Sequence, residues 1–440
     1  MSLTPPNPAA APGAAVTVTA PETPAAAAPA AHVSFGALRH PGYRMFFIGN
    51  ATAMLADNTE HVISYWMLYQ KFHSSALAGF AVLSHWIPFL LFSGWAGALA
   101  DRHDTRRMIQ LGMLMFMGVS ISWGLFFLTD SLHVWEAMVL LTIHGFAGVL
   151  WTAPAQLLIH DIVSHEHLQS GVRLGAIARY CGTLLGPAVG SGLLLLLGPA
   201  HGIFVNACVY LPMLLWLVRA PYGPRFRPKG SPRAPAPGLR DAIATLRAMA
   251  GNRIIMTMTL LAGCASFFIG TAYQAQMPGF AHDLGHGDPG TSYAVLVAAD
   301  AAGGLTAGIL LEARGLLAPS VGTALLIGML WAAALGSFAL SHIYPLSIAL
   351  LFTAGFMELA FGAMAQTLVQ LHAPVPLRGH VIGVFVMASM GLRTFSGLTI
   401  GLLGSFVGIH VSMSASAAAL IASIGILWWW SHRRMEPRAG

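Results

Sequence analysis

Residues Gly97–Arg107 read Gly-Ala-Leu-Ala-Asp-Arg-His-Asp-Thr-Arg-Arg and stand between two apolar runs, each long enough to cross a lipid bilayer. This short charged loop is therefore expected at a membrane surface. There the carboxylate of Asp101 can pair with the cations of Arg102, Arg106 and Arg107, or it can cap a neighbouring helix. Such a cluster can hold two helical bundles together in one state and release them in another. The alternative is a charged loop that only marks the cytoplasmic side.

The composition of the chain is that of an integral membrane protein. Of its 440 residues, 56% are hydrophobic and only 9% are charged, whereas a soluble domain carries roughly 25% charged residues. The mean hydropathy is +0.68. The apolar runs reach about 20 residues or more, which favours helices over the ~10-residue alternating strands of a membrane barrel. The net charge of +6 does not indicate nucleic-acid binding, because the basic residues fall mostly in loops on one side of the membrane.

Twelve apolar helical runs are predicted, six on each side of a polar segment rich in proline and arginine. We therefore expect an all-α membrane protein with two pseudo-symmetric six-helix bundles, at residues 35–219 and 251–431, joined by a basic cytoplasmic linker at 220–250. Residues 1–34 are expected to form a disordered cytoplasmic tail, and residues 432–440 a basic cytoplasmic tail. The predicted runs are 43–69, 75–99, 108–128, 135–158, 169–197, 201–219, 252–280, 291–312, 318–340, 345–371, 380–406 and 410–430.

The placement of Lys and Arg predicts the orientation of these helices. With twelve spans, the arginine-rich loops all fall on one side of the membrane, and the loops on the other side hold only Lys71. Basic loops stay in the cytoplasm. Both termini are therefore expected in the cytoplasm, and the protein is expected in a bacterial inner membrane, in contact with lipid and as a monomer.

The two halves of the chain repeat one another. The pattern Gly-x-Leu-x-Asp at 97–101 recurs 211 positions later as Gly-x-Leu-x-Glu at 308–312. Such a duplication of six helices is typical of secondary transporters, whose substrate site lies between the two repeats. Glu312 and the nearby Arg314 are therefore candidates for a gate equivalent to the one at Gly97, Asp101, Arg102 and Arg106. Further matches at nearly the same offset are Gly186 and Gly190 with Gly397 and Gly401, Gly145-Phe146 with Gly355-Phe356, and Ala155-Gln156 with Ala365-Gln366.

The first helix carries Asp57, Glu60 and His61 on one face, because spacings of three and four residues align side chains on a helix. A charged side chain near mid-membrane costs roughly 2.5–3.5 kcal/mol on insertion scales, so this face should line a cavity. Buried carboxylates can hold and release protons at physiological pH. Asp57 and Glu60 are therefore candidates for proton coupling or for binding a cationic group. The alternative is a structural ion pair or hydrogen-bond network.

His61 could titrate in the same range or bind a metal ion. A lone histidine in a membrane helix is more often a hydrogen-bonding core residue. The 19 histidines of the chain show no ligand spacing, so the sequence predicts no metal site and no cofactor.

Further charges are expected within the membrane, at Asp300, Glu358 and Arg393 in the second half and at Arg179 in the fifth helix. Two cations and several carboxylates in one apolar bundle suggest ion pairs that exchange partners as the halves rock. The alternative is a static set of salt bridges. Arg173, near the start of the fifth helix, is expected to extend to the lipid headgroups.

The loop after the second helix resembles the signature loop of the major facilitator superfamily, a large class of secondary transporters. In this chain Asp104 replaces the usual glycine and Thr105 replaces one arginine. The resemblance covers about residues 36–431 and implies proton-driven alternating access, with a substrate site near the membrane midplane. The residues that match are Gly97, Leu99, Asp101, Arg102 and Arg106.

Three other stretches resemble a bacterial exporter branch of this superfamily, which includes macrolide-efflux and enterobactin-exporter type proteins. One is the stretch from Ser74–Ala78 through Pro88 to Asp101-Arg102, the second is Pro376-x-Arg378-Gly379, and the third lies in the fifth helix. The fifth helix also resembles the exporters' glycine–proline motif, which favours export over uptake. Glycines four apart let helices approach closely, and proline bends a helix. The residues of this motif are Gly182, Gly186, Pro187 and Gly190.

The leading hypothesis is a proton antiporter that exports a small organic molecule, such as a siderophore or a drug. Proton-coupled uptake, or transport of a metal ion or chelate, is the second hypothesis. A membrane receptor without transport would not need titratable groups at the midplane. The chain has no phosphate-binding Gly-x-x-x-x-Gly-Lys-Ser/Thr loop, nucleophile elbow or zinc motif, so neither an ATP-driven pump nor an enzyme is expected.

Overall fold

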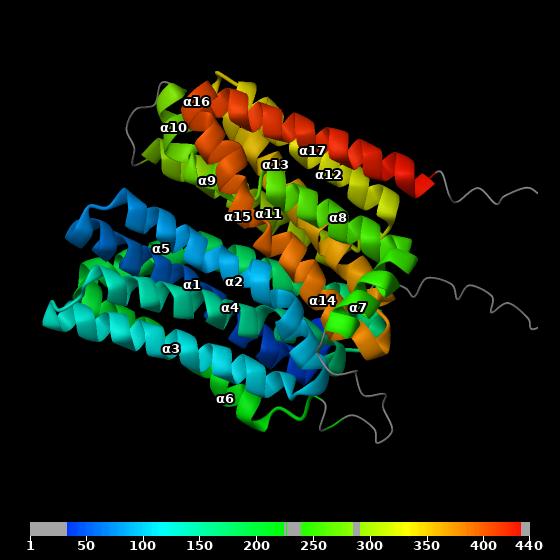
Figure 1. Ribbon diagram of the computed structural model, residues 1–440, viewed down its shortest axis with the longest axis horizontal. Helices are drawn as coiled ribbons and strands as arrows, with labels where there is room; N and C mark the ends of the chain where they lie inside the picture. Colours follow the sequence, from blue (N-terminus) through cyan, green and yellow to red (C-terminus); the bar gives the residue numbers. More distant parts are fainter. Residues whose placement is uncertain (1–32, 224–225, 227–238, 285–290, 433–440) are drawn as a thin grey trace, which may run out of the picture. The chain divides into compact units, whose positions relative to one another are not determined.

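The computed structural model describes residues 33–223, 226, 239–284 and 291–432 (Figure 1). The predicted tails at 1–34 and 432–440 lie almost wholly outside these residues, as do positions 224–225 and 227–238 of the predicted linker at 220–250. The described helices of the first half are η1 (Gly36–Arg39), α1 (Pro41–Phe72), α2 (Ser75–Arg102), α3 (Thr105–Thr129), α4 (Val134–Ile162), η2 (His165–His167), α5 (Leu168–Val209) and α6 (Leu211–Arg219).

The second half begins with α7 (Leu239–Gly251), which falls inside the segment that the sequence predicts as a linker. The helices that follow are α8 (Arg253–Phe268), α9 (Ala272–Ala275), α10 (Met277–Asp283), α11 (Thr291–Arg314), α12 (Val321–Leu340), α13 (Tyr344–His372), η4 (Val375–Leu377), α14 (Arg378–Val386), η5 (Met387–Gly391), α15 (Arg393–Ser396), η6 (Gly397–Leu402), α16 (Leu403–Val407) and α17 (Ile409–His432).

The long helices of the described chain form twelve membrane crossings. Ten described stretches are long and apolar enough to cross a membrane, and one of them, His165–Arg219, has 55 residues and holds two crossings. Gly198 separates the two, since its φ of 74° is not helical and Pro199 follows it. The 32-residue α1 is the twelfth crossing. Its length, about 48 Å at 1.5 Å per residue, is ample, and its charged residues explain why it is less apolar than the others.

Local sequence explains where several helices begin. The side chain of Ser74 accepts a hydrogen bond from the backbone of Leu77 at the start of α2, and Asp104 does the same for Arg106 at the start of α3. These side chains satisfy backbone N–H groups that have no partner within the helix. Asp104, which departs from the superfamily pattern, therefore has a capping role in this loop.

Two crossings of the second half are broken, although the sequence predicts them as continuous runs at 252–280 and 380–406. In the first, the chain leaves helical geometry between α8 and α9, where Gly270 has a φ of +50°. In the second, α14, α15 and α16 alternate with the π-helical segments η5 and η6. Short π-helical segments occur frequently at functional sites.

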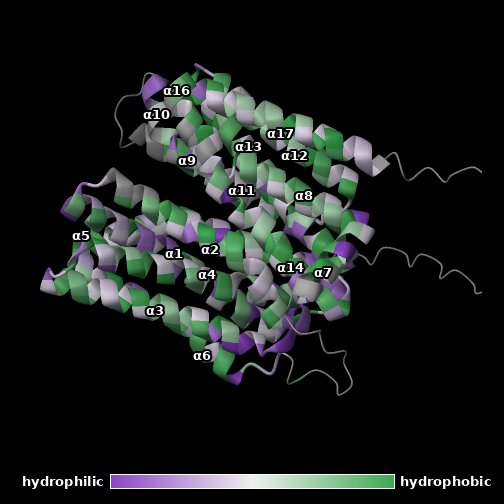
Figure 2. Ribbon diagram, viewed as in Figure 1, coloured by the Kyte–Doolittle hydropathy of each residue, from purple (hydrophilic) through white to green (hydrophobic). Residues whose placement is uncertain are grey.

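The exposed surface of the helices fits a lipid environment. Leu195 and Leu196 on α5 are 83% and 84% exposed, and many other large apolar side chains are also exposed. Figure 2 shows hydrophobic residues along the lengths of the helices and hydrophilic ones gathered near α6 and α7. Water would not favour so much exposed apolar surface, but lipid does.

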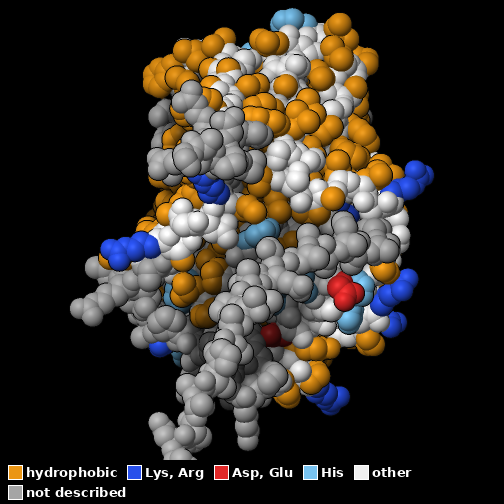
Figure 3. Space-filling view, turned by 90° about the vertical axis from the view of Figure 1, so that its right-hand side faces the viewer, with side chains coloured by type: hydrophobic (Ala, Val, Ile, Leu, Met, Phe, Trp, Pro, Cys, Tyr) orange, Lys and Arg blue, Asp and Glu red, His pale blue; other side chains and the backbone are white. Residues whose placement is uncertain are grey.

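Between the halves, α2 packs against α14, and α5 packs against α11. In the repeat, α2 and α11 are the second helices of the two halves, and α5 and α14 are the fifth. Each second helix therefore packs against the fifth helix of the other half. We call the region formed by the α2–α3 loop, the start of α5, the end of α11 and the start of α14 the closed end. Figure 3 looks onto the side of the molecule that holds α7 and α14, and blue Lys and Arg side chains lie around the rim of this face.

Candidate functional site

A cavity of about 160 Å³ lies between the two halves. The first half lines it with α4 and α5, and the second with α8, α9, α12, α13 and the broken eleventh crossing. Charged and polar side chains from both halves face it. They are Gln156, Arg179, Tyr180 and Thr183 from the first half, and Ser266, Thr271, Gln274, Glu358, Gln366, Ser389 and Arg393 from the second. A second cavity of about 60 Å³ also borders Gln156, Arg179 and Gln366.

The predicted carboxylates Asp300 and Glu358 come together in the second half. The hydroxyl of Tyr273 donates a hydrogen bond to Asp300 Oδ2 at 2.9 Å and lies 3.5 Å from Glu358 Oε2. Gln274 Nε2 donates to the same Asp300 oxygen at 3.3 Å. Asp300 is buried and Glu358 lines the cavity, so this pair connects the protein interior with the space between the halves.

The two predicted arginines lie in the same region. Arg179 and Arg393 both line the cavity and both interact electrostatically with Glu358. The guanidinium of Arg393 also lies 5.1 Å from the ring centre of Trp86, on α2 of the other half. This cation–π contact crosses the interface between the halves. The cavity therefore combines two cations, one carboxylate and aromatic surface.

Asp57 and Glu60 in α1 are held by a residue that the sequence analysis did not select, His144 of α4. Nδ1 of His144 lies 2.8 Å from Glu60 Oε1, and Nε2 lies 2.9 Å from Asp57 Oδ1. Ser120 of α3 donates to the other oxygen of Glu60. Asp57 keeps 17% of its side chain exposed, whereas Glu60 and His144 are almost fully buried. The imidazole thus bridges a partly exposed and a buried carboxylate.

His61 also lies beside His144, and His85 of α2 completes a group of three. The ring centre of His61 lies 4.7 Å from that of His144 and 5.0 Å from that of His85. The sequence analysis predicts no metal site, and no ligand spacing in the chain points to this group.

The glycines of the helix-5 motif form a close contact with α1. A Cβ atom at Gly182 would approach the backbone of Met54, and one at Gly186 would overlap Asn58. Gly190 faces Val62 in the same row. Pro187 lies inside a helix whose only non-helical residue is Gly198. The motif therefore positions α1, and with it Asp57, against α5.

At the closed end, Asp101 joins the two halves. Its oxygens accept hydrogen bonds from the backbone N–H groups of Gly379 and His380, at 2.7 and 2.9 Å, in the first turn of α14. The ring of His380 lies 2.8 Å from the same carboxylate. Gly97 packs so tightly here that a Cβ atom would overlap the carbonyl oxygen of Gly379. Asp101 therefore caps the start of α14, which is one of the two roles that the sequence suggests for it.

A second contact at the closed end joins the start of α5 to the end of α11. Ser170 donates to the buried carboxylate of Glu312. Arg173 donates to the carbonyl oxygens of Leu311, Leu316 and Leu317 at 2.7–3.0 Å. Arg173 is only 4% exposed. The prediction that it extends to the lipid headgroups is therefore wrong, because carbonyl groups in the last turn of α11 and just after it bind its guanidinium instead.

The arginines of the predicted gate lie near the ends of α2, α3 and α11. Arg106 forms an ion pair with Asp104 at 2.7 Å and donates to the carbonyl oxygen of Ala220, so it ties α3 to the end of α6 within the first half. Arg102 and Arg314 are exposed at the ends of α2 and α11.

Comparison with known proteins identifies the family. The model of the Major Facilitator Superfamily matches residues 45–397. The "Staphyloferrin A transporter" of Staphylococcus aureus (strain NCTC 8325 / PS 47) is 22% identical over 176 residues, which are 39% of this chain and 42% of that relative. The "Uncharacterized MFS-type transporter YfiS" of Bacillus subtilis (strain 168) is 24% identical over 378 residues, or 84% of this chain and 88% of that relative.

Solved structures agree with the family at the level of the fold. The human organic anion transporter TETRAN aligns with a TM-score of 0.69 at 15% identity, covering 89% of this chain and 99% of that one. A bacterial homologue of the iron transporter ferroportin, in an outward-facing state, aligns with a TM-score of 0.68 at 15% identity over 89% of this chain and 99% of that one. Since the family match spans most of the sequence and these neighbours share the fold of this chain, the chain belongs to the Major Facilitator Superfamily and is a multi-pass membrane transporter rather than an enzyme.

Proposed function

We propose that the protein is a proton-coupled transporter that exports a small organic molecule, of the siderophore or drug-like class, by alternating access. The observation that carries this proposal is the cavity between the halves, which Arg179, Glu358 and Arg393 line together. A site shared by both halves can change its accessibility when the halves move against one another. Its volume, about 160 Å³, is below the roughly 300–1,000 Å³ of typical ligand pockets. We therefore propose that it widens when substrate binds.

The lining favours a substrate with acidic or metal-chelating oxygen groups. Two guanidinium groups can bind carboxylate or similar oxygens through paired hydrogen bonds, and Trp331, Phe361 and Phe385 offer flat apolar surface. The similarity to the Staphyloferrin A transporter of Staphylococcus aureus supports a siderophore-type substrate. Glu358 would balance the arginines when no substrate is bound.

Coupling to protons is proposed at Asp300 and Glu358. Two carboxylates that share the hydroxyl of Tyr273 repel one another when both are charged. A proton on the pair removes this repulsion and frees Arg393 or Arg179 to bind the substrate. Asp57 and Glu60, bridged by His144, are a second place where a proton could be held.

The arrangement of charges supports a cytoplasmic location for the closed end. Arg102, Arg106 and Arg107 lie there, and basic loops stay in the cytoplasm. Both termini would then be cytoplasmic, and the conformation would be the one in which the cavity is closed towards the cytoplasm. Direction of transport needs a flux measurement, because exporters and importers share this conformation.

The test is proton movement in proteoliposomes. Purified protein is reconstituted with a pH-sensitive dye inside, a proton gradient is imposed, and siderophores and amphiphilic drugs are added in turn. We expect substrate-dependent dissipation of the gradient by the wild-type protein and its loss in Asp300→Asn. Asp130→Asn, at an exposed loop carboxylate, is the matched control and should behave as wild type. Wild-type coupling in the Asp300 variant would refute the assignment of proton coupling to Asp300 and Glu358. Substrate-driven proton flux of the sign opposite to antiport would replace export with uptake.

A further inference from the structure

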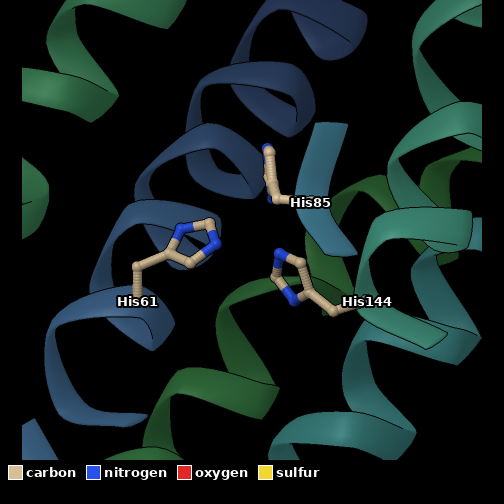
Figure 4. Close-up of side chains that lie close together, drawn as sticks. All are labelled: His61, His85 and His144. Carbon is tan, nitrogen blue, oxygen red and sulfur yellow. The ribbon is translucent and has the colours of Figure 1, made fainter. Parts of the chain in front are cut away.

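Three histidines from three helices of the first half converge on one point. His61 comes from α1, His85 from α2 and His144 from α4, and one ring nitrogen of each lies within 4.8 Å of the others. Figure 4 shows the three imidazole rings turned towards the space between these helices. The residues are not among those that line the two cavities between the halves.

Imidazole nitrogens at this spacing suit a transition-metal ion. Zn–N bonds of about 2.0–2.1 Å place ligand nitrogens roughly 3.4 Å apart in a tetrahedral site. The ring nitrogens lie within 4.8 Å of one another here, so binding of the ion requires them to approach by at most about 1.4 Å. Nitrogen ligands bind Zn²⁺, Co²⁺, Ni²⁺ or Cu²⁺, whereas Mg²⁺ and Ca²⁺ require oxygen.

The surroundings of His144 are those of a metal ligand. Metal-bound histidines usually donate their second ring N–H to a carboxylate, which fixes the orientation of the ring. Here Glu60 is within hydrogen-bond distance of His144 Nδ1, and Ser120 in turn donates to Glu60. Nε2, which contacts Asp57 Oδ1 in this structure, is the nitrogen that would bind the ion in place of that contact. Asp57 Oδ1, 2.9 Å from that nitrogen, is placed to be a fourth ligand.

His85 provides an independent observation. Its Nδ1 atom is buried and has no hydrogen-bond partner in the described part of the chain. A buried polar atom without a partner is uncommon in folded proteins and calls for a ligand or a functional reason. The nearest rings are those of Trp86, His61 and His144, at centre distances of 4.5–5.7 Å. A metal ion between the histidines would give the His85 ring a partner.

We propose that His61, His85 and His144, with Asp57 beside them, form a binding site for one divalent transition-metal ion inside the first half of the transporter. The site is separate from the proposed substrate cavity, and its existence does not depend on the substrate, the direction of transport or the coupling ion.

The test is metal binding by the full-length protein in detergent, after removal of any affinity tag that contains histidine. Co²⁺ is titrated and read by its visible absorption, whose intensity distinguishes four-coordinate from six-coordinate sites. Zn²⁺ is then added to displace it. We expect one equivalent of Co²⁺ with the intense bands of a four-coordinate site, and no effect of millimolar Mg²⁺.

Variants assign the site to these residues. His85→Gln should abolish the intense bands. Glu60→Gln, which alters only the group behind His144, should weaken Co²⁺ binding by about 10- to 100-fold. The control is His410→Gln, because His410 contacts Asp283 in the second half as His144 contacts Asp57 in the first. Absence of stoichiometric binding, or equal binding by the His85 and His410 variants, would overturn the proposal. Thermal unfolding of each variant without metal identifies any that fails to fold, and in that case Glu60→Gln decides.

Discussion

Replacing Asp101 with asparagine should open the closed end. The carboxylate accepts two backbone hydrogen bonds from the first turn of α14, and its side chain is only 5% exposed. Hydrogen bonds to a charged group contribute about 1.5–3 kcal/mol, and a charge at a helix N-terminus adds roughly 0.3–1 kcal/mol. Asparagine keeps the shape but loses the charge. A cost near 1.5–3 kcal/mol shifts the equilibrium between closed and open by about 10- to 100-fold, since 1.4 kcal/mol is tenfold.

The assay is the distance between two spin labels across the closed end. The three native cysteines are replaced by serine, and cysteines are introduced at Arg107 of the first half and Val375 of the second, both exposed. Pulsed electron paramagnetic resonance should show a longer-distance population in Asp101→Asn. Asp104→Asn removes a carboxylate of the same loop whose described bonds go to Arg106 of the first half, so we expect it to leave the distances unchanged. Unchanged distances in the Asp101 variant, or equal opening in both, would refute the reasoning.

Three further outcomes follow from the same contacts. Gly97→Val should also open the closed end, because its side chain would overlap the backbone of Gly379; unaltered spin-label distances would contradict this. Tyr273→Phe should uncouple proton movement from substrate while substrate binding persists, measured as flux against ligand affinity, because it removes only the shared hydroxyl. The Lys71–Asp130 ion pair should add little to stability, since Asp130 is exposed. Lys71 lowers the pKa of Asp130, so the contribution is present at neutral pH and disappears as acid protonates the carboxylate. Thermal melts of Asp130→Asn and wild type at two pH values would detect this difference.

The fold could be predicted because bilayer thickness restricts what an apolar run can be. Each run of about 20 residues predicts one crossing, and the observed α2, α3 and α4 extend the predicted runs by only a few residues. The break at Gly270 could not be predicted in this way. Glycine is common in this chain, with 48 residues, and hydropathy does not reveal which one takes a positive φ.

The candidate site was predictable only in part. Charges buried in apolar helices are costly, so Asp57, Asp300 and Glu358 could be selected without a structure. Their partners could not. His144 is 87 residues from Asp57 along the chain and meets it only because α4 packs across α1. A histidine side chain is usually neutral at pH 7, and His144 is not part of a short motif, so no pattern distinguished it from the other histidines of the chain.

The internal repeat explains the form of the closed end. In each half, the second helix ends in a carboxylate, Asp101 or Glu312, and each carboxylate contacts the start of the fifth helix of the other half. One duplicated pattern thus produces two equivalent contacts on either side of the interface. A movement that separates the halves at this end must break both. Because each of these hydrogen bonds is strong only at short range, a partial separation of the two halves loses most of their stabilisation. No other contact among the described residues replaces it. We infer that the closed end has two discrete states, which is what alternating access requires.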